Sequence, residues 1–138
     1  MSLSAGGIDP APSKFMHEKI LLVDNDRRSL MNIASFLRAE GYEVDEASNG
    51  NEAARLLDEE GFDLVLSDVI MPGLSGFHLI ERARSVASET PVLLMSGLPG
   101  IDYDYVTQRG ATDFIMKPLE FDELLSKVKR SLKLRSHT

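Results

Sequence analysis

The stretch LVLSDVIMPG, residues 64–73, joins a strand-like run to a turn. Its first part is almost continuously apolar, as in a strand that is buried on both faces, yet the run ends on a single acid, Asp68. Met71, Pro72 and Gly73 follow, and this sequence cannot continue a strand. A carboxylate at this point either caps the next helix or takes part in chemistry, and the rest of the chain has to decide between the two.

Four more short runs of this kind occur along the chain. With FDLVLSD (62–68) in third place, they are KILLVD (19–24), YEVDEA (42–47), PVLLMS (91–96) and TDFIMK (112–117). Four of the five are nearly continuously apolar, as strands covered on both faces are, whereas YEVDEA alternates like an edge strand.

Helical patterns separate the five runs and follow the last of them. Apolar residues share one helix face in four segments, namely Leu30, Ile33, Ala34 and Leu37; Ala53, Leu56 and Leu57; Leu79, Ile80, Ala83, Val86 and Ala87; and Phe121, Leu124, Leu125, Val128 and Leu132. The segment GIDYDYVTQRG (100–110) has the weakest helical pattern. Gly41, Gly61 and Gly110 stand where helices should end, and we expect each in the left-handed conformation that ends many helices.

The strict alternation of strand and helix predicts the fold class. Five strand–helix units predict an α/β fold with a doubly wound, five-stranded parallel sheet, right-handed crossovers and helices on both faces. In such sheets a ligand binds outside the carboxyl ends of the strands, where the strand order reverses. Functional residues are therefore expected at the strand ends.

The amino-acid composition excludes or disfavours several classes of function for this protein. The 138 residues are 43% hydrophobic, which suits one domain with an ordinary core. The net charge of −7 disfavours direct binding to nucleic acid or to an anionic membrane. The absence of cysteine excludes disulfides and thiolate chemistry, and no apolar run approaches the ~20 residues of a membrane span. We expect a soluble, cytoplasmic protein.

The two ends of the chain differ from the middle. Residues 1–17 are small, polar and rich in Pro and Gly, as in a flexible leader or an expression scar, so the domain is expected over residues 18–134 with a short tail at 135–138. The basic stretch KVKRSLKLRSHT (127–138) fits a helix C-terminus better than a binding patch, because apolar residues alternate with the cations at helical spacing.

Polar side chains do stand at the predicted strand ends. They are Asp24, Asn25 and Asp26 after the first strand, Asp68 after the third, Ser96 after the fourth and Lys117 after the fifth. If the strand order is 2-1-3-4-5, the first and third strands are neighbours, and Asp24, Asn25 and Asp68 converge on one pocket flanked by Ser96 and Lys117. Two carboxylates raise each other's pKa unless a cation joins them, and an all-oxygen site with room for water is one that Mg²⁺ accepts. The ammonium of Lys117 and the hydroxyl of Ser96 suit the oxygens of a phosphoryl group.

Four motifs in register resemble a known family. ILLVDND, LVLSDVIMPGLSG, PVLLMSG and GATDFIMKP stand in the order and at about the spacing of the receiver domain of two-component response regulators, a CheY-like, flavodoxin-like fold, over about residues 19–134. The resemblance implies that Asp68 is the phosphoacceptor and that Mg²⁺ is held by Asp24, Asn25, Asp68 and the carbonyl of Ile70. It also implies that Ser96 and Lys117 contact the phosphoryl group, that Phe114 is the aromatic switch residue, and that the bond between Lys117 and Pro118 is cis.

The same resemblance implies how such a domain works. A sensor histidine kinase or a histidine phosphotransfer protein would donate the phosphoryl group, and Asp68 would become an acyl phosphate. The domain would not be an enzyme with a separate substrate, because it catalyses transfer onto its own Asp68 and the slow hydrolysis of that product. Ser96 would then turn toward the phosphoryl group and Phe114 would fill the vacated space, which would change the face formed by the fourth helix, the fifth strand and the fifth helix. A homodimer through that face is also implied.

Asn25 departs from the family pattern, which has a second acid at this position. The loss of one negative charge predicts weaker Mg²⁺ binding. Asp26 either compensates or caps the first helix. A pseudo-receiver that binds partners without phosphorylation is therefore the alternative function.

Two other readings of the site fit less well. A flavin-binding module would need phosphate donors after the first strand. A phosphatase of the haloacid dehalogenase type would need an acid where Ile70 stands. His17, His78 and His137 show no ligand spacing.

Overall fold

The computed structural model describes residues 18–87 and 89–135, and these contain five strands and five helices. The strands are β1 (Lys19–Val23), β2 (Glu43–Ala47), β3 (Leu64–Asp68), β4 (Val92–Ser96) and β5 (Asp113–Met116). The helices are α2 (Arg27–Ala39), α3 (Gly50–Glu59), α4 (Gly76–Val86), α5 (Tyr103–Thr107) and α6 (Phe121–Arg135). The predicted leader, residues 1–17, and residues 136–138 of the predicted tail lie outside the described residues.

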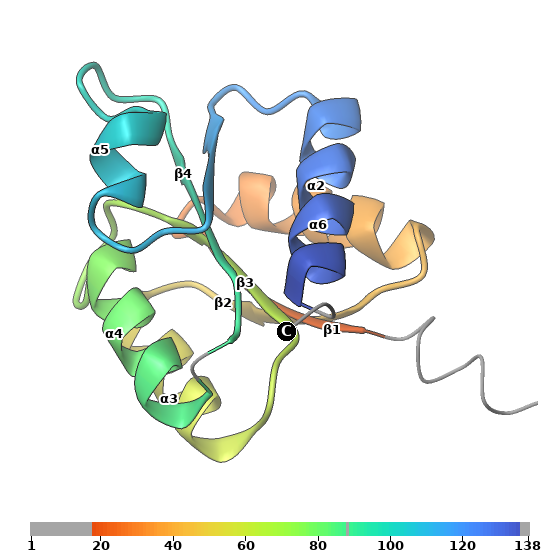
Figure 1. Ribbon diagram of the computed structural model, residues 1–138. Coiled ribbons are helices and arrows are strands. Elements are labelled where there is room, and N and C mark those ends of the chain that lie inside the picture. Colours follow the sequence, from red (N-terminus) through yellow and green to blue (C-terminus); the bar gives the residue numbers. More distant parts are fainter. Residues whose placement is uncertain (1–17, 88, 136–138) are drawn as a thin grey trace, which may run out of the picture.

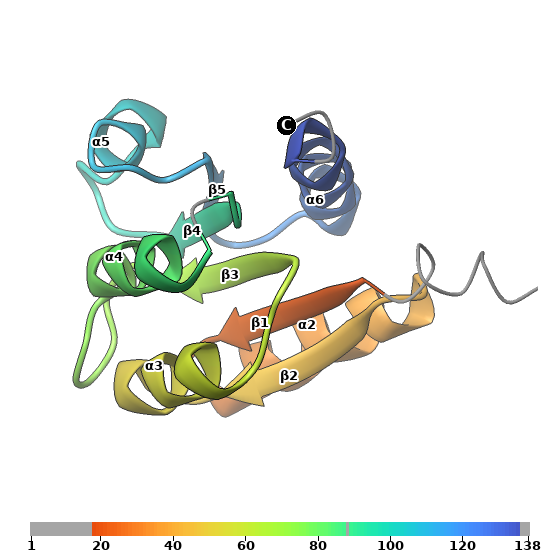
Figure 2. The same ribbon diagram turned by 60° about the horizontal axis from the view of Figure 1, so that its bottom comes forward.

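The sheet has the predicted topology. All four strand pairings are parallel, and the order is β2-β1-β3-β4-β5. Helices α2 and α6 cover one face of the sheet, and α3, α4 and α5 cover the other (Figure 1). The strand arrows point toward the same edge of the molecule (Figure 2). The expectation of a doubly wound α/β fold is confirmed.

Each central strand feeds two separate cores, because successive side chains of a strand point to opposite faces. In β1, Leu21 and Val23 pack with α3, α4 and α5, whereas Ile20 and Leu22 pack with α2 and α6. Burying one such side chain contributes roughly 1.5–3 kcal/mol. This two-sided burial explains why the run KILLVD is continuously apolar. The alternating run YEVDEA forms β2, an edge strand as predicted, and β5 forms the other edge.

The helix ends show which cap predictions hold. Asp26 caps α2, because its carboxylate accepts the backbone N–H of Arg28 at 3.0 Å and that of Ser29 at 3.3 Å. Gly41 and Gly110 have φ values of 101° and 105°, so their left-handed conformations are confirmed.

The prediction for Gly61 is wrong. Helix α3 ends at Glu59, and its C-cap Glu60 is already extended, with φ −136° and ψ 155°. The chain therefore leaves the helix directly into an extended segment, and no left-handed residue is required.

Helix α4 is shorter on its buried face than its apolar pattern indicates. Val86 is the last residue of α4 and is 49% exposed, and Ala87 has an extended backbone that ends the helical face. Helix α5 has only five residues, which agrees with the weak pattern in that segment. No helix within residues 18–87 and 89–135 is long and apolar enough to span a bilayer.

Candidate functional site

The predicted site residues gather at the carboxyl edge of the sheet. Asp24 follows β1, Asp68 ends β3, Ser96 ends β4 and Lys117 follows β5. The parallel register places Ser67 beside Val23, Asp68 beside Met95 and Ser96 beside Met116, so the strands end nearly level with one another. Side chains that are up to 93 residues apart in the chain therefore meet at one edge.

Lys117 joins the two carboxylates of the site. Its Nζ lies 2.6 Å from Asp68 Oδ1 and 3.0 Å from Asp24 Oδ2. Asp24 is fully buried and Asp68 is 6% exposed. The other oxygen of Asp24 accepts the backbone N–H of Asp26 at 2.9 Å. Two carboxylates at such burial are stable only with a cation and donors around them, and the ammonium of Lys117 meets that need.

The pKa values of the two carboxyl groups, Asp24 and Asp68, are shifted in opposite directions. Burial, together with the hydrogen bond to Asp24, raises the pKa of Asp68 from 3.8 to about 7, although Lys117 opposes the rise. Burial also raises the pKa of Asp24, but hydrogen bonds with Asp68, Ser29, the N–H of Asp26 and Lys117 outweigh it, so the pKa is lowered. Burial lowers the pKa of Lys117, but its bonds to Asp68 outweigh that effect and raise it. Asp68 is thus the carboxyl group that takes a proton first.

The raised pKa of Asp68 predicts a pH dependence of stability in metal-free buffer. As the pH rises from about 4 to about 7, the unfolded chain ionises at Asp68 while the folded chain stays largely protonated, so the free energy of unfolding falls by an amount on the order of 3 kcal/mol. Asn cannot ionise, so the melting temperature of Asp68→Asn should rise relative to wild type between about pH 4 and pH 7. Thermal unfolding with a chelator present measures this, and a difference that does not change with pH would contradict it.

Ser96 and Phe114 lie on the two strands next to β3 on this side of the sheet, Ser96 at the end of β4 and Phe114 within β5. The Ser96 hydroxyl oxygen accepts the N–H of Leu98 at 3.0 Å, and the Ser96 carbonyl accepts the N–H of Lys117 at 3.0 Å. Phe114 is 5% exposed and packs with the core under α3, α4 and α5. The bond between Lys117 and Pro118 is cis, in agreement with the geometry that the resemblance implies.

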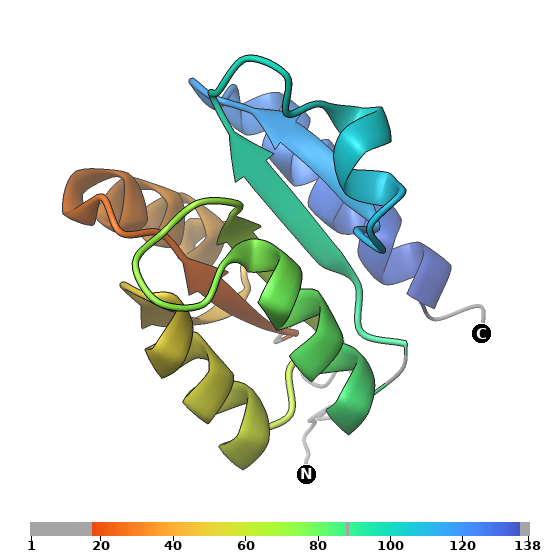
Figure 3. The ribbon, with the colours of Figure 1, turned by 90° about the vertical axis from the view of Figure 1, so that its left-hand side faces the viewer.

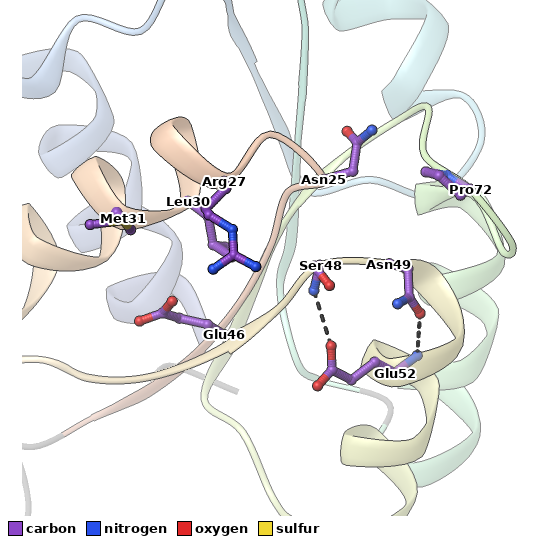
Figure 4. A pocket seen from close by; sticks show the side chains of 9 residues that line it. All are labelled: Asn25, Arg27, Leu30, Met31, Glu46, Ser48, Asn49, Glu52 and Pro72. Atoms are coloured by element: carbon purple, nitrogen blue, oxygen red, sulfur yellow. Dashed lines mark hydrogen bonds between the residues drawn. The ribbon is translucent and has the colours of Figure 1, made fainter.

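Ile70 and Asn25, both predicted as metal ligands, are exposed. Ile70 is 60% exposed, in the loop that follows β3. Asn25 is exposed and lies at a cavity of about 590 Å³ that is also lined by Arg27, Ser48 and Asn49. Figure 4 shows its amide directed away from Ser48 and Asn49.

The residues predicted to bind Mg²⁺ can be compared with the ligands that this cation prefers. Within residues 18–87 and 89–135, no three His, Asp or Glu side chains gather as ligands for a metal ion. Two carboxylates, one amide oxygen and one backbone carbonyl remain, and these are all oxygen donors, as Mg²⁺ prefers. The residues therefore fit Mg²⁺ with fewer charges than a site with three acids would have.

One site residue was not predicted from the sequence. Ser29 in the first turn of α2 hydrogen-bonds to Asp24. A hydroxyl in the first turn of the helix after a strand that ends in an acid is the signal that could have indicated it.

His78 lies at the start of α4, where its Nδ1 accepts the N–H of Ser75 at 3.2 Å, which agrees with a surface role.

The fold and the residues at the carboxyl edge of the sheet are together those of a CheY-like domain of the flavodoxin-like class. The sequence matches the response regulator receiver domain over residues 20–129. The chain therefore belongs to the family of response regulator receiver domains.

Relatives and solved structures agree with this family. The uncharacterized transcriptional regulatory protein YkoG of Bacillus subtilis (strain 168) is 38% identical over 116 residues, which are 83% of this chain and 50% of that protein. The transcriptional regulatory protein HprR of Escherichia coli (strain K12) is 31% identical over 117 residues, 83% of this chain and 52% of HprR. The chain thus spans about half the length of the curated relatives it matches.

Two solved structures show the same fold. The CheY-like receiver domain protein of Methanospirillum hungatei JF-1 superposes with a TM-score of 0.80 at 29% identity, covering 88% of this chain and 98% of that one. The chemotaxis response regulator CheY4 of Vibrio cholerae superposes with a TM-score of 0.76 at 30% identity, covering 83% of this chain and 98% of that one.

Proposed function

We propose that this receiver domain accepts a phosphoryl group on Asp68 from a histidine kinase or a histidine phosphotransfer protein. The observation that carries the proposal is the position of Lys117 Nζ, 2.6 Å from Asp68 and 3.0 Å from Asp24. An ammonium at this place is available to the oxygens of an incoming phosphoryl group once Asp68 has formed its new bond. Membership of the family supports the same function.

The reaction follows from the chemistry of a carboxylate nucleophile. An oxygen of ionised Asp68 attacks phosphorus, the bond from phosphorus to the histidine nitrogen of the donor breaks, and that nitrogen keeps the electron pair. The transition state is loose, with charge spread over the phosphoryl oxygens, so fixed positive charge stabilises it most. Lys117 supplies such a charge. Asp24, Asn25, Asp68 and the carbonyl of Ile70 would hold Mg²⁺, which supplies further charge neutralisation when bound.

The product changes the hydrogen bonds around Ser96. In the structure the Ser96 hydroxyl oxygen accepts from Leu98 N–H, and its own proton is available for a phosphoryl oxygen. A turn of Ser96 toward Asp68 would vacate space for Phe114, which packs in the neighbouring core. The face that would respond is formed by α5, β5 and α6, and this face is our proposed surface for a homodimer or a downstream partner.

Intact-mass spectrometry after incubation with acetyl phosphate tests the proposal. We expect a single phosphoryl adduct that requires Mg²⁺. No adduct on a folded protein would contradict the proposal and would favour the pseudo-receiver, a domain that binds its partners without phosphorylation.

We further propose, from the composition of this segment, that it does not bind nucleic acid itself and that it works in the cytoplasm.

Asn25→Asp should tighten Mg²⁺ binding. The substitution adds one negative charge next to Asp24, and one unit charge at about 4 Å from a divalent cation is worth roughly 2 kcal/mol even in water. We therefore expect the dissociation constant to fall by about tenfold or more, as measured by isothermal titration calorimetry. Asn49→Asp, at the cap of α3, is the matched control for an added acid at the same cavity. Equal or weaker binding by Asn25→Asp would contradict the prediction.

A further inference from the structure

A buried carboxylate that the proposed mechanism does not use lies on β5. Asp113 is 5% exposed, and its Oδ2 lies 2.7 Å from Arg130 Nη2 of α6. Its Oδ1 accepts the backbone N–H of Phe114 at 2.7 Å and lies 3.5 Å from Lys127 Nζ. A buried carboxylate is stable only where such partners replace water. The two cations from α6 therefore hold Asp113 against the helix.

Lys127 extends this cluster to the backbone of Phe114. Its Nζ donates to the carbonyl oxygen of Phe114 at 2.5 Å and lies 3.4 Å from Glu123 of its own helix. Both polar groups of the Phe114 backbone are thus bonded to side chains, the N–H to Asp113 and the C=O to Lys127. Since β5 is an edge strand, these bonds attach α6 to the open edge of the sheet.

Phe114 connects the two sides of the sheet. Its side chain packs in the core under α3, α4 and α5, whereas the next residue, Ile115, packs with α2 and α6. Figure 3 shows β5 running between α5 and α6. Phe114 therefore has its ring on one face and its backbone bonded to the helix of the other face. Any movement of its backbone changes the bond to Lys127.

We propose that Asp113, Lys127 and Arg130 form a latch between β5 and α6, in which Lys127 is the positioning residue that transmits a movement of Phe114 to the surface of α6. The proposal rests on the proposed function, because phosphorylation is what would move Phe114. When the carbonyl of Phe114 shifts, Lys127 loses that acceptor and is left with Asp113 and Glu123, so the position of its ammonium on α6 depends on the position of the Phe114 backbone.

The opposite edge of the sheet supplies a matched control. On β2, the carbonyl of Val44 accepts from Arg38 Nη2 of α2 at 2.8 Å, and Arg38 also lies 2.8 Å from Glu46. This contact also joins a helix cation to an edge-strand carbonyl. Val44 belongs to the strand that carries none of the proposed site residues, so Arg38→Met should leave the response of α6 unchanged.

The coupling is tested by amide NMR spectra of α6 before and after treatment with acetyl phosphate and Mg²⁺, with the adduct measured by intact mass. Wild type, Arg38→Met and Lys127→Arg should show the same shifts of the α6 amides. In Lys127→Met those chemical-shift changes should be smaller by about fivefold or more, at an unchanged adduct level. The reason is that the charged hydrogen bond from Lys127 to the carbonyl of Phe114 is lost. Shifts in Lys127→Met equal to those of wild type would overturn the proposal.

A second measurement separates the latch from the proposed function. Without phosphorylation, exchange of the Phe114 amide hydrogen should be about tenfold faster in Lys127→Met and in Asp113→Asn than in wild type or Arg38→Met. Unchanged exchange in both variants would overturn the latch. A failure of wild type to form an adduct would instead contradict the proposed function, while the exchange rates would still decide whether the latch exists.

Discussion

Asp68→Asn should abolish the phosphoryl adduct that wild type forms with acetyl phosphate and Mg²⁺. An amide is not a nucleophile that can form an acyl phosphate, whereas its oxygen can still accept from Lys117, so the site should stay folded. Asp24 cannot take over the role, because it is fully buried and both of its oxygens are engaged, one by Lys117 and one by the N–H of Asp26. Intact mass followed by peptide mapping measures the loss.

Asp122→Asn is the matched control for this substitution. Asp122 lies exposed in the first turn of α6 and is not one of the proposed site residues. Its variant should form the adduct at the rate of wild type. An adduct on Asp68→Asn would place the acceptor elsewhere and would contradict both the proposed nucleophile and the role of Lys117.

Gly50→Ala should destabilise the fold and slow phosphorylation. Gly50 begins α3, and a Cβ atom on it would lie 1.9 Å from the carbonyl oxygen and 2.6 Å from the carbonyl carbon of Leu74. These are backbone atoms of the loop between β3 and α4, so the conflict cannot be relieved by turning a side chain. That loop also carries Ile70, whose carbonyl belongs to the proposed metal site. We expect a loss of about 3 kcal/mol, which lowers the melting temperature by roughly 10 °C.

Gly61→Ala is the control for this prediction. A Cβ atom on Gly61 has nothing within 4 Å, and the backbone there is not left-handed. Ala should therefore be tolerated and should change the melting temperature by no more than about 2 °C, with a small gain because the unfolded chain loses freedom. Equal melting temperatures for the two variants would show that the loop moves aside without loss of stability.

Local patterns in the sequence were sufficient to predict the architecture. The continuous apolar runs and the helical faces predicted the parallel sheet with helices on both sides, because burial on one or two faces imposes those periods directly on the residues. Asp24, Asp68, Ser96 and Lys117 were also recognisable, since a parallel sheet brings all its strand ends to one edge. The left-handed Gly41 and Gly110 follow from local chemistry in the same way.

Other features depend on contacts that no local pattern contains. Gly61 stands in the same kind of sequence position as Gly41, yet the chain leaves α3 extended, because the path toward β3 decides the conformation there. The opposite pKa shifts of Asp24 and Asp68 arise from unequal hydrogen bonding among groups that are both buried.

The sequence by itself therefore determined the elements, their order and the residue types at the site. Only the tertiary structure decided which carboxylate Lys117 approaches more closely, how Ser29 supports Asp24, and that Asp113 and Lys127 hold the backbone of Phe114. The physical reason is that periodicity records only whether a side chain is buried. Its partners, which set charge, pKa and coupling, come from distant segments that are brought together by packing.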